Sequence, residues 1–475
     1  MDAHPSARED YATSTDNHRT EDARSAAKDG WIAYPLIDAL RERRSRRFGM
    51  GMGIPGGPLA YKSQHEPLPL TEEEIAILAF AACGITGPAL GDWVWTEEAG
   101  GNMLANLIGR TVGSADAVHA VSLVVSNDHG TWLMRKPTDL PPAGALEVAE
   151  LARAGEFVEA WRRVRVRLAD HRLAPPVEPP SNINPNRWSL YAPGTTIFLP
   201  IAELTHMAIN AVLELFNEHT GFLALDERRM FLPAGVGRFV RSRGGWLDDD
   251  PKDLKTLSVS FAERIVTELA VVEMGMVLQN LYLACQALGL GGFSHYTFSD
   301  FSHAEPSWFD ALGFRTASMP LTKFFGVPKP ASWLLKLRRQ DVPIRYPVGL
   351  ERDGKVLLRP YCPPYYPSME AAVRAVVEFK LGPEGTYRAG IGAGAWKDPS
   401  GMSAGIPPVT EKGYQAVAAH CEYLWERYGR FPVYLPAFHT LASFQAAHVD
   451  VDFYERFYEP GVLTDRHRSH LSRWH

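Results

Sequence analysis

Arginine and hydroxyl side chains meet at residues 43–45, within the run RERRSRRF. Arg43, Arg44 and Ser45 together suit a phosphate monoester, because guanidinium and hydroxyl groups both donate hydrogen bonds to phosphate oxygens. A second basic group, Lys336 and Arg338, follows a Gly–x–Pro turn. Each group has another interpretation, the solvated basic end of an element, and for residues 43–45 taken alone that interpretation is favoured.

A small polar turn precedes an apolar run of residues. The turn is GRTVGSADA (109–117), and the run VHAVSLVVS (118–126) is rich in β-branched residues, which predicts a buried strand. Such a turn can bring its backbone amides and the Ser114 hydroxyl against a flat polar ring. The alternative is an ordinary loop.

Two helices have clear boundary signals. Thr71 and Glu74 form a capping-box pattern ahead of an apolar run that ends at Gly84. A second, longer helix is predicted for residues 260–289, ended by Gly289.

The longer helix is almost wholly apolar, but polar residues interrupt it. Glu273, Gln279, Asn280 and Gln286 lie within it, which excludes a membrane span and favours a helix buried inside protein. The amides of Gln279 and Asn280 must find partners. They are consistent with a helix packed at a subunit interface.

In this order, the segments resemble the nitroreductase superfamily, and most closely its branch of thiazole- and oxazole-forming dehydrogenases that act on ribosomal peptides. The matching residues beyond 43–45 are Gly84-Ile85-Thr86, Arg110-Thr111-Val112-Gly113-Ser114-Ala115-Asp116-Ala117, and Glu273, Gly275, Gln279, Asn280, Leu281, Leu283, Ala284, Leu288, Gly289, Leu290 and Gly291. The helix that contains the last set is the most specific part. The resemblance does not extend to residues 131–257 or 341–475.

The resemblance implies an FMN cofactor in a cleft at the interface of a homodimer, with the long helix packed against its two-fold mate. Arg43, Arg44 and Ser45 would then hold the ribityl phosphate. Lys336 and Arg338 would close on that phosphate from the C-terminal side.

The resemblance also places the flavin ring. Ser114 and its neighbouring amides would contact the isoalloxazine edge, and the backbone near Tyr296 and Thr297 would donate to flavin N5. Gly113 stands where the family usually has proline, and Asp116 where it has glycine. These departures leave open altered chemistry or loss of FMN.

The implied function is an FMN-dependent oxidoreductase with hydride transfer at flavin N5, either an oxidase or a dehydrogenase acting on a biosynthetic intermediate. One alternative is an NAD(P)H-dependent nitro- or quinone reductase. Another is a non-catalytic, nitroreductase-like binding subunit whose cofactor site has decayed. The substrate is expected to be a small molecule or a peptide.

The expected fold class is α+β, a mostly antiparallel sheet wrapped by helices. Residues 1–30 are expected to be a disordered tail, and residues 31–136 and 258–340 an FMN-binding core. Residues 137–257 are interpreted as an insertion that forms a lid, and residues 341–475 as a C-terminal extension of unknown role.

Composition excludes several classes of function. With 49 basic and 55 acidic residues and a net charge of −6, the chain has no excess positive charge for a nucleic acid. Its four cysteines are far apart, as expected for reduced thiols in the cytoplasm. No secretory signal or membrane segment is expected.

Two other motifs do not predict a binding site. GMGIPG (51–56) matches GxGxxG but lacks the preceding strand and following helix of a dinucleotide site. No metal is expected, because the polar residues near the C-terminus match no familiar ligand spacing. Those residues are His439, His448, Asp450, Asp452, His467 and His470.

Overall fold

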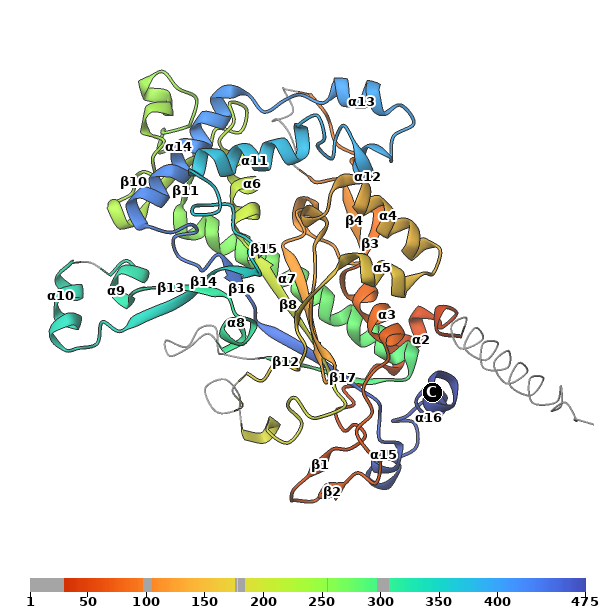
Figure 1. Cartoon of the computed structure of the whole chain (residues 1–475). Helices are drawn as coiled ribbons and strands as arrows, with labels where there is room; N and C mark the ends of the chain where they lie inside the picture. Colours follow the sequence, from red (N-terminus) through yellow and green to blue (C-terminus); the bar gives the residue numbers. More distant parts are fainter. Residues whose placement is uncertain are drawn as a thin grey trace, which may run out of the picture.

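The computed structural model describes residues 30–96, 105–175, 177, 184–253, 255–296, 307–327 and 329–475. Within these residues the largest sheet has seven strands in the order β12-β17-β8-β5-β6-β7, with β16 also paired to β8. All of these pairs are antiparallel. The strands are β5 (Val121–Asn127), β6 (Gly130–Met134), β7 (Arg165–Ala169), β8 (Thr196–Glu203), β12 (Gly291–Tyr296), β16 (Phe438–His439) and β17 (Ala442–Ala447). Together with the surrounding helices (Figure 1), the sheet confirms the α+β class.

Both faces of the central strands are covered. Every residue of β5 and of β8 is buried, which explains why their sequences are apolar runs without alternation. The long helix α7 (Val259–Leu288) packs on one face, together with α3 (Glu72–Cys83). On the other face, Trp308 and Phe309 of α8 (Ser307–Leu312) join a second core.

The two predicted helix boundaries are confirmed. Thr71 and Glu74 form the capping box at the start of α3, and Gly84 follows its last residue. Gly289 ends α7 in the left-handed conformation, with φ of 87°. This conformation favours glycine, because a Cβ would crowd the backbone.

The interpretation of residues 137–257 as a lid laid over a finished core is wrong for much of the segment. β8 belongs to it and lies between β5 and β17 in the sheet. The helix α6 (Thr205–Leu215), which follows β8, is largely buried in the same core as α7. The segment therefore builds the sheet, and removing it would remove a central strand.

Residues 341–475 are likewise part of the main fold. They supply β17, which lies between β12 and β8. The helices α11 (Met369–Leu381) and α14 (Glu411–Tyr428) pack beside α6 in the main core.

One part of the chain projects from this body. We call residues 314–349 the arm; it contains β13 (Arg315–Pro320), α9 (Leu321–Phe324), α10 (Lys329–Leu337) and most of β14 (Pro343–Arg352). Figure 1 shows α10 at its outer end. The pair Asp353–Gly354 predicts a tight hairpin turn. Beyond the arm, β14 pairs with β15 (Lys355–Leu358) through this turn, and both residues have positive φ.

Two further predictions of local structure are corrected. The run from Gly144 to Arg172 predicts one basic amphipathic helix, but the chain instead forms α4 (Pro142–Arg153), α5 (Phe157–Val164) and strand β7. Gly155, with φ of +81°, separates the helices, and the alternation of Val166 and Leu168 with arginines suits a strand. The run PVYLP (432–436) predicts a strand, but it forms none.

The remaining elements are α2 (Leu36–Glu42), β1 (Gly53–Ile54), β2 (Tyr61–Lys62), β3 (Ile85–Pro88), β4 (Ile108–Arg110), β9 (Leu223–Asp226), β10 (Leu232–Pro233), β11 (Thr256–Ser258), α12 (Gly390–Ala393), α13 (Pro399–Gly405), α15 (Val451–Phe457), α16 (Asp465–Arg468) and α17 (His470–Trp474). Among the described residues, no helix combines the length and apolar character needed to cross a bilayer. The expected tail, residues 1–30, lies outside the described residues except for Gly30.

Candidate functional site

Arg43 and Ser45 lie against the C-terminal half of α7. The Arg43 guanidinium stands over the Tyr282 ring, 4.7 Å from its centroid, at a distance typical of a cation–π contact. The Ser45 hydroxyl lies 3.3 Å from the Tyr282 hydroxyl. Arg44 turns back on the chain and donates to the carbonyl oxygens of Arg41 and Arg43. Two of the three residues predicted to hold a phosphate therefore share one aromatic partner.

Tyr282 connects this segment to β12. Its hydroxyl accepts a hydrogen bond from the Ser294 backbone N–H at 2.8 Å and lies 2.9 Å from the Ser294 hydroxyl. Within the described chain, the Arg43 guanidinium meets no protein acceptor. We call Arg43, Arg44, Ser45, Tyr282 and Ser294 the arginine–hydroxyl group. It offers cationic and hydroxyl donors in one place, as a phosphate monoester requires.

Tyr296 lies at the end of β12. Alternate residues of a strand face the same side, so Tyr296 lies on the same face of β12 as Ser294. Its side chain is 61% exposed. Thr297, which was predicted with it to lie near flavin N5, is outside the described residues.

Two polar side chains that no sequence motif marked, Arg47 and His295, lie at the opposite face of β12. The Arg47 guanidinium lies 4.4 Å from the Phe293 ring centroid, and its Nε is buried without a partner among the described residues. The Nε2 of His295 is also buried and unpartnered in that set. Burial, with the nearby Arg47 charge, lowers the pKa of His295 to about 4.

The turn that contains Ser114 lies beside α7, nearer the start of that helix than Tyr282. Its hydroxyl accepts a hydrogen bond from the His119 backbone N–H at 2.9 Å. A Cβ built on the adjacent Gly113 would lie 3.5 Å from the Met276 sulfur of α7. Met276 precedes Tyr282 by a helical rise of about 9 Å. The residues predicted to contact the ring and those predicted to contact the phosphate thus lie beside the same helix.

Lys336 and Arg338 are not brought to this group. Both are exposed, at the end of α10 and just beyond it. Figure 1 shows α10 at the outer end of the arm, on the side of the molecule opposite α2. Within one chain, the predicted phosphate site is therefore divided.

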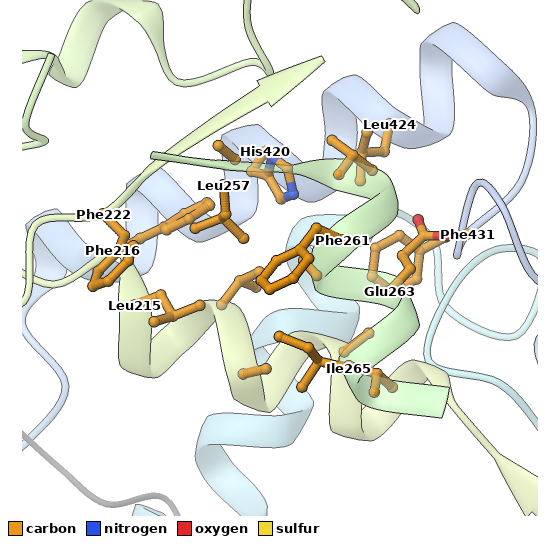
Figure 2. Close-up of a pocket in the computed structure, with 17 residues that line it drawn as sticks. Leu215, Phe216, Phe222, Leu257, Phe261, Glu263, Ile265, His420, Leu424 and Phe431 are labelled. Carbon is orange, nitrogen blue, oxygen red and sulfur yellow. The ribbon is translucent and has the colours of Figure 1, made fainter. Parts of the chain in front are cut away.

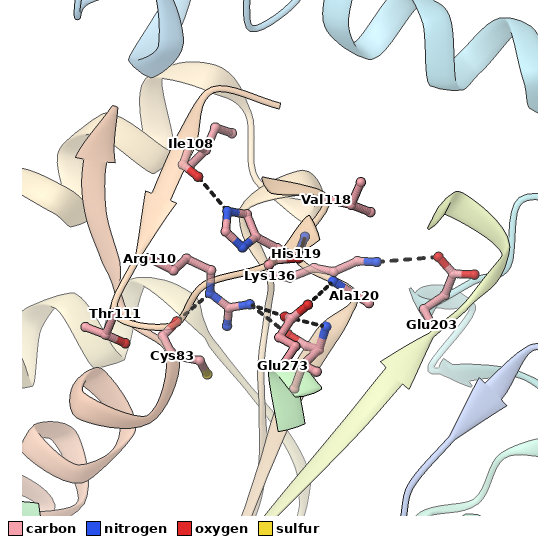
Figure 3. Close-up of polar contacts among 12 residues, drawn as sticks. Cys83, Ile108, Arg110, Thr111, Val118, His119, Ala120, Lys136, Glu203 and Glu273 are labelled. Atoms are coloured by element: carbon pink, nitrogen blue, oxygen red, sulfur yellow. Dashed lines mark hydrogen bonds and ion pairs between the residues drawn. The ribbon is translucent and has the colours of Figure 1, made fainter. Parts of the chain in front are cut away.

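Two ion pairs lie in the interior of the fold (Figure 3). Arg110 Nη1 lies 3.7 Å from Glu273 Oε1, and Lys136 Nζ lies 3.6 Å from Glu203 Oε2. Burial raises the pKa of the Glu203 carboxyl, although Lys136 opposes the shift. Burial and the Arg110 charge lower the pKa of His119 to about 3.

Lys136 and Glu203 also line a cavity of about 560 Å³. Arg135, Asp139 and Arg359 contribute further charges to its wall. A buried carboxyl group with a raised pKa beside a lysine can transfer a proton to or from a bound molecule. Spacing along the sequence could not have found this pair, because Lys136 follows β6 and Glu203 ends β8, two strands that only the folded sheet brings to either side of β5.

A second cavity, of about 170 Å³, is lined almost entirely by apolar side chains of α6, α7 and α14 (Figure 2). Two titratable groups enter it, Glu263 and His420. Burial raises the pKa of Glu263 to about 7 and lowers that of His420 to about 4. Both groups therefore favour the neutral state in an apolar enclosure.

The outer face of α7 is apolar and exposed. We call Phe261, Ile265, Leu269, Val272 and Met276 the apolar stripe; they recur every three or four residues, and each is more than a third exposed. Residues at this spacing share one helix face. A helix packed at an interface was expected to point the amide of Asn280 toward the partner. The amide instead donates within the chain, to the carbonyl oxygens of Ala81 and Thr111.

No protein-family model and no curated protein matches the chain. Among solved structures, it is similar to a protein from Ralstonia eutropha JMP134 described as a nitroreductase, with 14% identity over 59% of this chain and 76% of that chain and a TM-score of 0.26. A similarity at this level carries no argument about function.

Proposed function

We propose that this protein is an FMN-dependent oxidoreductase of the nitroreductase type that acts as a homodimer. The observation that supports the proposal is the arginine–hydroxyl group around Tyr282 of α7, because a guanidinium without a protein acceptor among the described residues, beside three hydroxyl groups, has the chemistry to hold a ribityl phosphate. The apolar stripe lies on the same helix. A second copy packed on that stripe would lie next to the proposed cofactor.

The residues present fit the phosphate end of FMN. Arg43 has no protein acceptor in the described chain, so its guanidinium is free to bind an anion while Tyr282 holds it in place. Arg44 adds a second positive charge, and Ser45 adds a hydroxyl donor. Lys336 and Arg338 stay a prediction, because in this fold only the arm of a second copy could bring them to this group.

At the ring end, the proposal assigns the contact to the turn that contains Ser114. When bound, FMN supplies the ability to accept or donate a hydride. The turn is fixed from behind, since Glu273 accepts hydrogen bonds from the backbone N–H groups of Ala120 and Val121 at 3.2 and 3.1 Å. A fixed turn would hold a flat ring in one orientation, and packing of the second copy would exclude water from it.

The substrate is proposed to be a small molecule or a peptide intermediate, oxidised by the enzyme. Glu203 is the proposed proton carrier, because its carboxyl group lies on a cavity large enough to admit part of a substrate. The NAD(P)H-dependent nitro- or quinone reductase and the non-catalytic binding subunit are the competing functions.

The test is an absorbance spectrum of the purified full-length protein after desalting and again after addition of FMN. The proposal expects a yellow protein whose flavin elutes with the protein. Each charge-assisted contact contributes about 1.5–3 kcal/mol, so an Arg43→Ala/Arg44→Ala double variant should bind FMN at least about tenfold more weakly. Arg41→Ala is the matched control, because Arg41 is an exposed arginine of the same segment that pairs with Asp38.

Each outcome separates the candidates. A colourless protein without FMN affinity rules out the proposal and supports the non-catalytic subunit. Unchanged FMN affinity in the double variant means that another site holds the phosphate. Rapid bleaching of the bound flavin by NADH or NADPH, before any other substrate is added, would favour the nitro- or quinone reductase.

A further inference from the structure

Three histidines and one glutamate converge where α3, β17 and α17 meet. We call Glu74, His448, His470 and His475 the His–Glu group. Glu74 Oε1 lies 2.8 Å from His470 Nε2 and 3.1 Å from His448 Nε2. His475 Nε2 lies 3.0 Å from His448 Nε2 and 3.8 Å from Glu74 Oε2. The four potential ligand atoms all lie within 4.8 Å of one another.

Backbone contacts fix the orientation of two of these histidines. His448 Nδ1 lies 2.8 Å from the Leu68 carbonyl oxygen, and His470 Nδ1 lies 2.8 Å from the Leu288 carbonyl oxygen. A carbonyl oxygen only accepts, so both Nδ1 atoms carry hydrogen. In the neutral imidazole, each Nε2 is then a bare lone pair aimed at the Glu74 carboxylate. Two lone pairs facing a carboxylate repel unless a cation or added protons lie between them.

Glu74 is oriented in the same way. Its Oε2 accepts hydrogen bonds from the Thr71 backbone N–H at 2.7 Å and the Thr71 hydroxyl at 2.9 Å. The capping box that begins α3 therefore turns Oε1 toward the histidines. Such secondary hydrogen bonds to histidine and carboxylate ligands are typical of metal sites.

We propose that the His–Glu group binds one Zn²⁺ ion in a closed, structural site. In a tetrahedral site with metal–ligand distances of about 2.0–2.2 Å, neighbouring ligand atoms lie about 3.3 Å apart. The separations given above run from 2.8 to 3.8 Å. Glu74, His448 and His470 are at most 3% exposed, whereas the His475 side chain is 21% exposed and provides a path of entry.

The ion would connect parts of the chain that are distant in sequence. Glu74 lies in the first turn of α3, His448 directly follows β17, and His470 begins α17. All four positions are filled by protein, so no position remains for a reactant and the role is structural. The proposal does not depend on FMN binding.

This inference revises the expectation of no metal. Only His448 and His470 belong to both the sequence-selected set and the His–Glu group. Asp450 and Asp452 of that set lie instead with His65 in a separate, mostly exposed group.

The test is the metal content of full-length protein produced without a polyhistidine tag. We expect about one zinc per chain by elemental analysis. We also expect a fall in Tm when a strong chelator removes the zinc, and the intense visible absorption of tetrahedral Co²⁺ when cobalt replaces it. His470→Ala and Glu74→Gln should lose the zinc, and their Tm should no longer respond to the chelator.

His65→Ala is the matched control, because it removes a histidine from the other His–Asp group and should leave the zinc in place. His475→Gln changes only the partly exposed ligand, so it reports on the site if the buried variants fail to fold. Metal-free protein whose Tm ignores both zinc and chelator would overturn the proposal, and protons alone would then hold the group together. Zinc lost in His65→Ala but retained in His470→Ala would overturn it as well.

Discussion

Arg110 and Glu273 form an ion pair in the interior of the fold, with each side chain 1% exposed. Arg110 also donates to the carbonyl oxygens of Cys83 and Val121, so neither charge depends on the other alone. The pair connects β4, next to the Ser114 turn, with the middle of α7. Through this contact, the two ends of the proposed flavin site share one rigid support.

Breaking this pair should be costly. Arg110→Ala leaves the Glu273 carboxylate buried without its cation, and loss of one partner of a buried pair destabilises by about 3–5 kcal/mol. Urea unfolding monitored by circular dichroism measures the change. Arg162→Ala removes an exposed ion pair with Glu72 and should cost less than about 1 kcal/mol. Similar losses in the two variants would show that the interior pair contributes no more than a surface pair.

Val272→Asp should prevent self-association. Val272 is 56% exposed in the middle of the apolar stripe, and a carboxylate there would have to be desolvated in an interface between two copies. Light scattering at micromolar concentration should change from the dimer mass to the monomer mass. Leu146→Asp is the control, because Leu146 is an exposed apolar residue on α4. A wild-type monomer contradicts the dimer directly.

Lys136→Met should destabilise the protein more at pH 8 than at pH 5. The pKa of Glu203 is raised in the folded state, so the folded state favours the protonated carboxyl group. A glutamate in the unfolded chain has a pKa of about 4.3, and stability therefore falls as the pH rises above that pKa. Without Lys136 the ionised form is costlier still, and the loss grows with pH. Adding Glu203→Gln should remove most of that pH dependence in a double-mutant cycle. Additive effects at both pH values would mean that the two side chains are not coupled.

Acid should unfold the protein through its buried histidines. Burial lowers the pKa of His119 to about 3 and those of His295, His420 and His439 to about 4. An unfolded histidine has a pKa of about 6.5, so the unfolded state binds more protons and stability is lost as pH falls from about 6.5 toward 4. Each histidine contributes up to about 1.4 kcal/mol per pH unit.

His420→Gln isolates one of these contributions. Glutamine can still donate to the Ala234 carbonyl oxygen, which His420 contacts through Nδ1. The difference in unfolding free energy between wild type and variant should narrow between pH 7 and pH 5, because only the wild type takes up the proton on unfolding. Raised pKa values at Glu203 and Glu263 favour the opposite trend, but they are common to both proteins. If the difference in unfolding free energy does not change with pH, the pKa of His420 is the same in the folded and unfolded states, as for a solvent-exposed histidine.

Local signals in the sequence predicted local structure well. The capping box of Thr71 and Glu74, the glycine that ends α7 and the Asp353–Gly354 turn all depend on residues a few positions apart. The resemblance assigned Arg43, Arg44 and Ser45 to a phosphate site, and that assignment stays a prediction. The same resemblance expected Lys336 and Arg338 nearby, and the length and path of the arm place them elsewhere in the chain.

Features that depend on contacts between distant segments could not be predicted. The run RVRLA (165–169) follows a helix and contains two arginines, and it becomes strand β7 because β6 offers a partner for pairing. Glu74 was interpreted only as a helix cap, although its second oxygen faces two histidines more than 370 residues away in sequence. No spacing pattern contains that information, since the strand and the helix that carry these histidines are brought to α3 by the sheet.

The position of β17 also determines when the protein can fold during synthesis. β12 and β8 do not pair with each other, and each is hydrogen-bonded to β17, which begins at residue 442. Until the ribosome has made β17, the edges of β8 and β12 that pair with it have no hydrogen-bonding neighbour. Contacts this distant in sequence form slowly, and the unpaired edges are prone to aggregation meanwhile. Production in cells should therefore benefit from chaperones that bind unfolded chains.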